Sequence, residues 1–235
     1  MYSYLRLIWY DRYRLQTCRT MARFYFLRHG ETAWNAQGRL CGSTDVSLSD
    51  AGRRQAQLLA LRLRPIAVDA LYSSPLSRAL ETACLIGKAI GLEPVVDHRL
   101  AELNYGTWEG RTFEEIERGT PAAYQAWDAD PAQLAPPQGE SGVQLIQRVM
   151  PFLAEAAERH QQGNVVVVCH KTVCRLLACH ILGIPLIEYR RRITIDNAAL
   201  SILEAVEGGW RVVTLNDTCH LPLPTAPSIA AEEGE

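Results

Sequence analysis

The sequence lacks a strong net charge, because 24 basic residues stand against 26 acidic ones and the formal charge is -2 over 235 residues. Such a balance gives no global reason to expect nucleic acid or an anionic membrane as the partner. The chain also lacks any apolar run near the roughly 18 residues that cross a bilayer as a helix. We therefore expect no nucleic-acid partner and no membrane partner, and any recognition of an anion must be local.

The N-terminus lacks the apolar core of roughly 7 to 15 residues that a signal peptide needs, because Asp11, Arg12 and Arg14 interrupt it. Its residues show no hydrophobic period, whereas MARFYFLRHG leads directly into a predicted strand. We interpret residues 1–21 as an N-terminal extension, with Met21 as the functional start. A short surface-docked segment is the alternative.

The seven cysteines lack the close pairs of a disulfide scaffold or a zinc knuckle, and their number is odd. This pattern predicts reduced thiols and a cytoplasmic protein. Cys169, Cys174 and Cys179 lie near His170 and His180, which invites a metal interpretation. However, five helical residues turn through about 500°, so we expect these cysteines to face different ways as small buried residues. No metal and no cofactor is expected.

With 48% apolar residues, the chain is long enough to bury a sizeable core as one large domain with an inserted cap. Runs that predict strands alternate with amphipathic stretches that predict helices, in the order βαβα. The strand predictions are residues 23–28, 68–75, 164–170, 198–206 and 210–216. The helix predictions are residues 49–64, 76–90, 140–160 and 173–182, with Ser49 as N-cap and with Gly91 and Gly183 as stops. The four consecutive valines predict a central parallel strand that is buried on both faces.

Residues 100–140 interrupt this rhythm with glycines and prolines around a short helical stretch near residues 113–118. We interpret them as a small cap inserted into a domain that spans residues 22–218. Residues 219–235 contain proline, alanine and acidic residues without a period, which predicts a disordered tail.

Side chains that can bind or attack a phosphate group follow the predicted strands. Arg28 and His29 end the first strand, where a guanidinium can bind phosphate through two hydrogen bonds and an imidazole can act as a nucleophile. Arg78 lies in the first helical turn after the second strand, where backbone amides favour anions. His170 follows the valine strand, where ligand-binding residues of α/β sheets gather. Each residue alone could be an ordinary surface or core residue, but together they predict one anion site at one edge of the sheet.

Five segments carry a resemblance to a known family. They are FLRHGETAWN, TDVSLSDAGRRQA, SSPLSRALETA, AELNYGTWEG and VVVVCH, in this order. From about Arg23 to about Asn216 the chain resembles the histidine phosphatase superfamily, also called phosphoglycerate mutase-like, and within it the phosphatase branch. The resemblance implies an α/β fold, a three-layer α/β/α sandwich with a mostly parallel central sheet and a small inserted cap, which agrees with the alternating pattern.

The resemblance also implies roles for individual residues. His29 is similar to the nucleophile that accepts the phosphoryl group, and Glu102 to the residue that protonates the leaving oxygen and then takes a proton from water. Glu102 lies among apolar and aromatic residues, a setting that can raise a carboxyl pKa, although alone it would be an ordinary exposed carboxylate. The implied phosphate pocket consists of Arg28, Arg78 and His170. These groups can supply the charge that other enzymes obtain from a metal ion, so the resemblance implies that no metal ion is required.

Thr32 and Asn35 match family positions that add hydrogen bonds to phosphate. Lys171 departs from the family, which usually has Ser-His-Gly-Gly where this chain has Cys-His-Lys-Thr. Two interpretations of Lys171 stay open, namely a cation for a substrate carboxylate or second anionic group, and a solvated side chain. Asp196 and Asn197 either serve a neighbouring loop or form a turn.

Trp34 and Tyr105 are the aromatic residues that we expect at the mouth of the substrate site. Trp108 and Trp127 are further candidates, although aromatic residues are more often found in the core.

The function that this sequence predicts is metal-independent hydrolysis of a small phosphomonoester through phosphohistidine. Candidate substrates are phosphoserine, α-ribazole phosphate, and sugar or glycerate phosphates. The first alternative is a mutase of the phosphoglycerate type, which the short insertion and the Tyr-Gly-Thr-Trp-Glu-Gly segment favour less. A non-catalytic module that binds a phospholigand is the alternative from another class, but a binder needs no proton donor such as Glu102. A homodimer stays open, because it would leave no distinctive mark.

Overall fold

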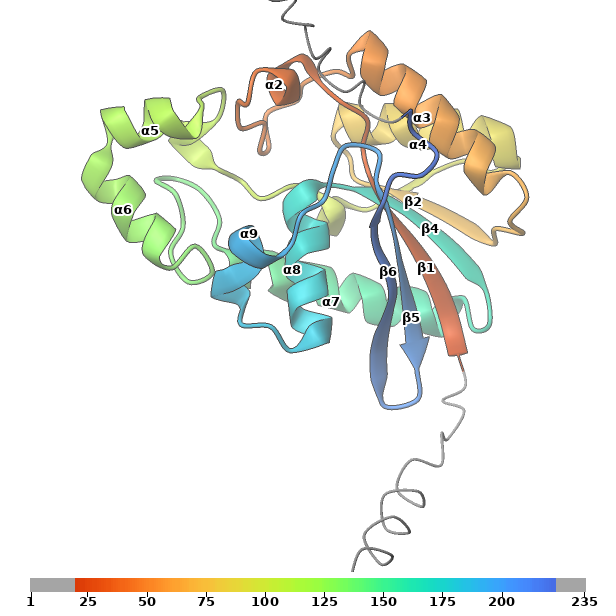
Figure 1. The fold of residues 1–235 in the computed structure, drawn as a ribbon. Helices are drawn as coiled ribbons and strands as arrows, with labels where there is room; N and C mark the ends of the chain where they lie inside the picture. Colours follow the sequence, from red (N-terminus) through yellow and green to blue (C-terminus); the bar gives the residue numbers. More distant parts are fainter. Residues whose placement is uncertain (1–19, 223–235) are drawn as a thin grey trace, which may run out of the picture.

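The computed structural model describes residues 20–222, and in them one sheet runs between two layers of helices (Figure 1). The strands are β1 (Thr20–Arg28), β2 (Ala70–Ser73), β3 (Val95–Val96), β4 (Asn164–Cys169), β5 (Leu200–Val206) and β6 (Gly209–Asp217). They lie in the order β3-β2-β4-β1-β5-β6. β4 pairs in parallel with β1 and β2, and β2 with β3, whereas β5 pairs antiparallel with β1 and β6. The prediction of a mostly parallel sheet is confirmed.

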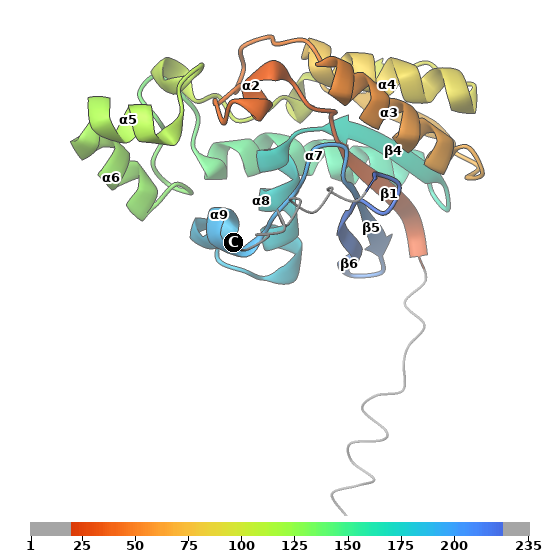
Figure 2. The same cartoon turned by 45° about the horizontal axis from the view of Figure 1, so that its top comes forward.

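Each face of the sheet has its own pair of long helices. These are α3 (Asp50–Leu63) and α4 (Ser77–Ile90) on one face, and α7 (Gly142–Arg159) and α8 (Lys171–Leu182) on the other. Because strand residues alternate, Phe24 and Phe26 of β1 pack with α7 and α8, and Tyr25 and Leu27 with α3 and α4. Figure 2 shows the sheet between these layers. The three-layer sandwich is confirmed, and the valines of β4 are fully buried as predicted.

Several helix ends lie where the sequence predicts them. The Ser49 hydroxyl accepts a hydrogen bond from the amide of Gly52 (3.0 Å) and begins α3. Gly91 and Gly183 end α4 and α8 in the left-handed conformation, with φ of 75° and 69°. Since β1, β2 and β4 run parallel, the residues that follow them meet at one edge of the sheet.

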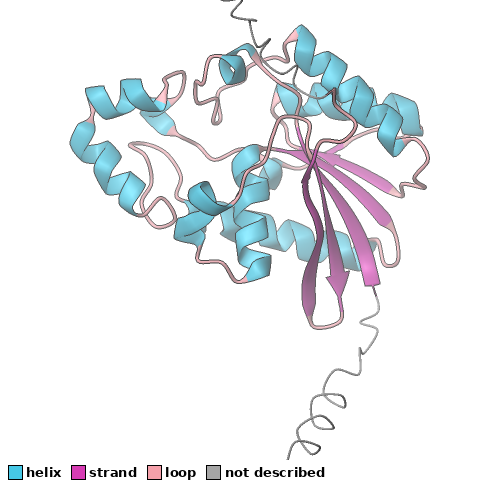
Figure 3. Cartoon of the chain, viewed as in Figure 1, coloured by secondary structure: helices cyan, strands magenta, loops and turns pink. Residues whose placement is uncertain are grey.

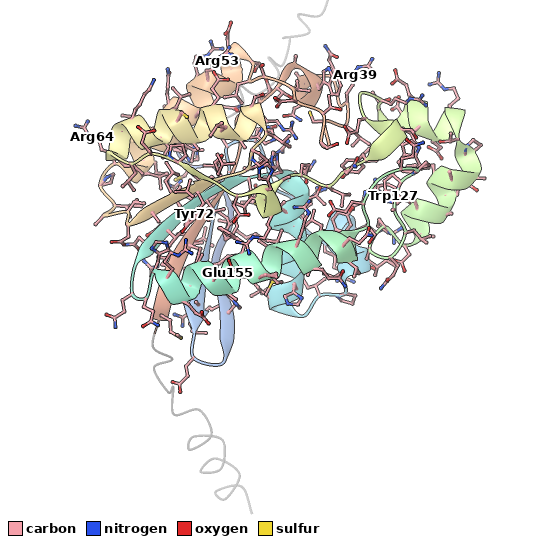
Figure 4. The ribbon with its side chains drawn as sticks, turned by 180° about the vertical axis from the view of Figure 1, so that it is seen from behind. Arg39, Arg53, Arg64, Tyr72, Trp127 and Glu155 are labelled. Atoms are coloured by element: carbon pink, nitrogen blue, oxygen red, sulfur yellow. The ribbon has the colours of Figure 1, made fainter. Side chains whose placement is uncertain are left out.

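The predicted cap is helical and lies beside the sandwich (Figure 3). It contains α5 (Phe113–Gly119), which confirms the short helix predicted there, and α6 (Pro121–Ala129), which the sequence pattern does not predict. Trp108 and Trp127 pack against each other in its core, with ring centroids 5.3 Å apart, and Figure 4 shows Trp127 within the cap. The shorter elements are α2 (Ala33–Ala36), η1 (His98–Leu100), η2 (Gly106–Trp108), η3 (Leu186–Glu188) and α9 (Tyr189–Arg192).

Both ends of the domain differ from the predicted boundaries. β1 begins at Thr20 rather than at residue 23, because its pairing with β5 extends that far. The start of the predicted tail is held in place, since Arg62 of α3 donates to the Cys219 sulfur (2.9 Å) and His220 Nε2 lies 3.1 Å from the carbonyl of Ala198. The rest of the predicted extension and tail, residues 1–19 and 223–235, lies outside the described residues. Between residues 20 and 222, no helix is long and apolar enough to cross a membrane.

Candidate active site

A cavity of about 610 Å³ opens where the parallel strands end. Its walls come from the end of β1, the loop after α2, the cap, the first turns of α8 and the segment around α9. The predicted site residues that line it are Arg28, His29, Asn35, Arg78, Glu102, Tyr105 and Lys171. The His170 ring lies next to them, with its centroid 5.1 Å from that of His29. Thr32 and Trp34 are not among the residues that line the cavity.

His29 is held in one tautomer by its neighbours. Its Nδ1 lies 2.6 Å from the carbonyl oxygen of Gly30, and because a carbonyl only accepts, Nδ1 carries the proton. Nε2 accepts a hydrogen bond from Nε of Arg78 at 3.3 Å. Burial, and then the charges of Arg78 and Arg28, lower the pKa of His29 well below its ordinary value. The ring is therefore neutral, with its lone pair on Nε2.

The next residue must be a glycine for steric reasons. A Cβ atom on Gly30 would lie 2.3 Å from the carbonyl oxygen of Gly52 in α3. Only a residue without a side chain allows the backbone after His29 to pass this close to the helix.

Two buried arginines supply the positive charge. Arg78 is fully buried and donates to the carbonyls of Thr44 (2.9 Å) and Gly42 (2.6 Å), while Arg28 donates to the carbonyl of Ile195 (2.8 Å). Burial lowers the pKa of Arg28 to about 10 and also lowers that of Arg78. Because arginine is not deprotonated in proteins, both guanidinium groups still carry their charge, and Nε of Arg28 is buried without a hydrogen-bond partner.

His170 is oriented by a residue that the sequence analysis does not single out. Its Nε2 lies 2.7 Å from the hydroxyl of Ser74, the residue that follows β2. Its Nδ1 is buried without a partner. Burial, and then the charge of Arg78, lower the pKa of His170 well below its ordinary value. This ring is therefore neutral, and within the phosphate cluster the positive charge comes from Arg28 and Arg78.

Glu102 is buried, with 8% of its surface exposed, and not an exposed carboxylate. One oxygen accepts from the amide of Leu103 (2.8 Å) and the other from the amide of Thr172 (3.2 Å) in α8. The Thr172 hydroxyl lies 3.2 Å from that of Tyr105, which belongs to the cap. Burial raises the pKa of Tyr105 to about 12, so its hydroxyl stays protonated. These contacts join the cap to the sandwich beside the carboxylate.

Thr32 shapes the loop after His29. Its hydroxyl caps α2 by accepting from the amide of Asn35 (3.1 Å), and the Asn35 side chain accepts from the amide of Thr32 (3.2 Å). Asn197 donates to the same Asn35 oxygen (3.0 Å) and so supports a neighbouring loop, while the Ala199 amide donates to the Asp196 carbonyl (3.2 Å), so the expected turn is formed as well. Trp34 lies against Gly110 of the cap. A direct contact of Thr32 or Trp34 with a substrate therefore has no support in this arrangement.

Glu109 is a further residue that the sequence analysis does not single out. Its carboxylate accepts hydrogen bonds from the amide and hydroxyl of both Ser43 and Thr44, and from the amide of Tyr105. This loop presents the Gly42 and Thr44 carbonyls to Arg78. Glu109 is thus linked to Arg78 through the loop between them.

The expectation that the cysteines near His170 face different ways is wrong for one pair. The sulfur atoms of Cys169 and Cys174 lie 3.5 Å apart, because Cys169 ends β4 and Cys174 lies in the first turns of α8. Both are buried, and burial raises the pKa of the Cys169 thiol well above its ordinary value. Between residues 20 and 222, no cluster of three or more histidine, cysteine or acidic side chains is placed to hold a metal ion.

Known proteins resemble the chain over nearly its whole length. Phosphoserine phosphatase 1 of Hydrogenobacter thermophilus is 36% identical over 201 residues, which cover 86% of this chain and 95% of that protein. A probable phosphoglycerate mutase of Yersinia pestis is 34% identical over 215 residues, covering 87% of this chain and 97% of that protein. The solved structure of a mycobacterial glucosyl-3-phosphoglycerate phosphatase in complex with VO3 has a TM-score of 0.74 and 34% identity, covering 83% of this chain and 98% of that one.

A sequence profile of the family points the same way. The profile described as histidine phosphatase superfamily (branch 1) matches residues 24–218. This range includes His29, His170, Arg28, Arg78 and the whole cap. By this match and by these relatives, the chain belongs to branch 1 of the histidine phosphatase superfamily.

Proposed function

We propose that the chain, a phosphatase by family, hydrolyses a small phosphomonoester through a phosphohistidine formed on Nε2 of His29. The observation that carries the proposal is the state of this ring. Its Nδ1–H is directed to the Gly30 carbonyl, and its Nε2 lone pair lies beside Arg78. A neutral imidazole next to a fixed cation can attack phosphorus while the cation neutralises the phosphoryl oxygens.

In the first step, the Nε2 lone pair forms the N–P bond as the ester P–O bond breaks. The leaving alcohol oxygen takes a proton from Glu102, which acts here as a carboxylic acid. The phosphoryl oxygens lie among Arg28, Arg78 and His170, whose N–H groups donate to them. Placing two buried arginines here lets the protein itself supply the charge that this reaction needs.

In the second step, water attacks phosphorus and gives its proton to the Glu102 carboxylate. The N–P bond breaks, its electron pair returns to Nε2, and inorganic phosphate leaves. A mutase would instead pass the phosphoryl group to a second hydroxyl of the same substrate, and a binding module would not form the N–P bond.

The test is phosphate release from a panel of phosphoserine, 3-phosphoglycerate, α-ribazole phosphate and sugar phosphates, in excess chelator. The wild type should release phosphate and His29→Ala should not. Isomerisation of a phosphoglycerate without net release would favour the mutase. Binding of the panel without any turnover by wild type would favour the binding module, and loss of activity in chelator would contradict metal independence.

A further inference from the structure

The cavity has more positive charge than the phosphate cluster accounts for. In addition to His29, seven basic and three acidic side chains line the cavity. Arg28 and Arg78 belong to the phosphate cluster. The remaining basic side chains are Arg39, Lys171, Arg175, Arg190 and Arg191.

Three of these five have protein partners. Arg39 contacts Glu115 (3.0 Å), and both Arg190 and Arg191 contact Asp128. The Arg190 guanidinium also lies over the rings of Phe113 and Trp127, 4.5 and 4.4 Å from their centroids. Arg39 and Arg190 are thus held by contacts with the cap, whereas the largely exposed Arg191 lies 4.0 Å from the Asp128 carboxylate.

Lys171 and Arg175 have no such partner. Among the described residues, neither side chain makes a hydrogen bond or an ion pair, and Nε of Arg175 is buried without an acceptor. They are four residues apart on α8, so they lie on one face of the helix, where two like charges destabilise it. A half-buried pair of cations without a counter-ion costs stability, which is unusual unless a ligand supplies the anion.

Burial disfavours the charged form of both side chains. Burial, and then the charges of Arg175 and Arg28, lower the pKa of Lys171 to about 8, although Glu102 and Asp196 act in the opposite direction. Burial also lowers the pKa of Arg175. An anion at this place would stabilise the charged form of both side chains.

We propose that Lys171 and Arg175 form a second anion subsite, which binds a carboxylate on the substrate while His29 reacts with its phosphoryl group. This inference rests on the proposed function. Lys171 follows His170 directly, so the carboxylate must lie within a few bonds of the phosphoryl group. The ammonium and the guanidinium match the two oxygens of a carboxylate, whereas a second phosphate would add a third oxygen for which Arg190, already paired, is not free.

Phosphoserine and phosphoethanolamine test this directly, because they differ only in the carboxylate. Wild type should prefer phosphoserine in kcat/KM. Lys171→Met and Arg175→Gln should each lower kcat/KM for phosphoserine by ~10-fold to ~100-fold, mainly through KM, while phosphoethanolamine changes less than about threefold. The matched controls are Lys88→Met, which changes the only other lysine of the chain on the exposed side of α4, and Arg54→Gln on α3.

The outcomes separate the two proposals. If both variants lower the rates of both substrates equally, or if wild type has no preference, the subsite is wrong although the phosphatase function stands. If the variants instead reduce only hydrolysis of propane-1,3-diol bisphosphate, relative to its monophosphate, the second group is a phosphate and the carboxylate assignment is wrong.

If wild type hydrolyses none of these compounds, the proposed function fails and the subsite is tested by equilibrium binding. The His29→Ala protein should then bind phosphoserine more tightly than phosphoethanolamine. Adding Lys171→Met to it should abolish that difference, and a difference that persists would overturn the subsite.

Discussion

Glu109 should act as a positioning residue for Arg78, and Glu109→Gln is the change that tests it. One carboxylate oxygen accepts from the Ser43 amide, the Ser43 hydroxyl and the Tyr105 amide, and the other accepts from the amide and hydroxyl of Thr44. A glutamine keeps one acceptor oxygen, so at best it preserves the first three hydrogen bonds. Its NH2 group would then face the two Thr44 donors. Thr44 is also the residue whose carbonyl accepts from Arg78 (2.9 Å).

The magnitude follows from these two lost bonds. Each hydrogen bond to a charged acceptor contributes roughly 1.5 to 3 kcal/mol when buried, and Glu109 is half-buried, so we expect a total loss of about 2 to 3 kcal/mol in the free energy of unfolding. Removing a fixed donor from a reacting anion costs about 10²-fold to 10³-fold in rate, and a displaced donor costs less. We therefore expect kcat/KM to fall by ~10-fold to ~100-fold.

The assays are urea denaturation, steady-state kinetics with phosphoserine and inhibition by inorganic phosphate, with Glu114→Gln on the exposed face of α5 as control. A double-mutant cycle with Arg78→Lys isolates the coupling. If Glu109 acts through Arg78, the kinetic effect of Glu109→Gln should nearly vanish in the Arg78→Lys background. Additive kinetic effects, or lost stability with unchanged phosphate inhibition, would refute this reasoning.

Three further predictions concern the two anion positions and the histidines. Because Lys171 is charged only below its pKa of about 8, the preference for phosphoserine over phosphoethanolamine should be constant near pH 7 and fall as the pH rises through 8, and Lys171→Met should show no such step. Enzyme quenched with base during turnover should retain labelled phosphate and acid-quenched enzyme should lose it, since phosphohistidine is acid-labile; an acid-stable label would point to serine or threonine. Ser74→Ala should lower the free energy of unfolding by roughly 1 to 3 kcal/mol in urea denaturation, because it leaves a buried nitrogen of His170 without its partner; an unchanged midpoint would mean that the 2.7 Å contact is not made.

The fold could be predicted from the sequence where a local signal decides it. The valine run of β4, the Ser49 cap and the glycine stops at residues 91 and 183 each depend on a few neighbouring residues. The missed helix α6 has a weaker signal, because it begins at a proline and its only buried residue is Trp127. Trp127 packs against aromatic rings from elsewhere in the cap and against the guanidinium of Arg190, which no local pattern reveals.

The site residues likewise fall into those that a local sequence pattern reveals and those that depend on tertiary contacts. Residues directly after parallel strands could be found, since the ends of such strands meet by topology. Ser74 also follows a strand, so its position was a signal, but its contact with His170 depends on the order of strands. Glu109 and Arg175 come from the cap and from the second turn of α8, and their importance depends on which loop or cavity they face. The contact between Cys169 and Cys174 was missed because a helical turn was assumed across the junction between a strand and a helix.

The choice of side chains in the cavity follows from how burial acts on each base. Burial lowers the pKa of Arg28 to about 10, so the guanidinium still carries its charge beside the reacting phosphate. A lysine begins at 10.5, and the less deeply buried Lys171 has already fallen to about 8. A lysine at the position of Arg28 would therefore hold its charge less firmly than the arginine does. Burial, together with the charges of Arg78 and Arg28, also keeps His29 unprotonated and leaves its Nε2 lone pair available. Arginines, which keep their charge, therefore suit the buried inner part of the cavity. Lys171, whose pKa is about 8, suits its half-buried outer part.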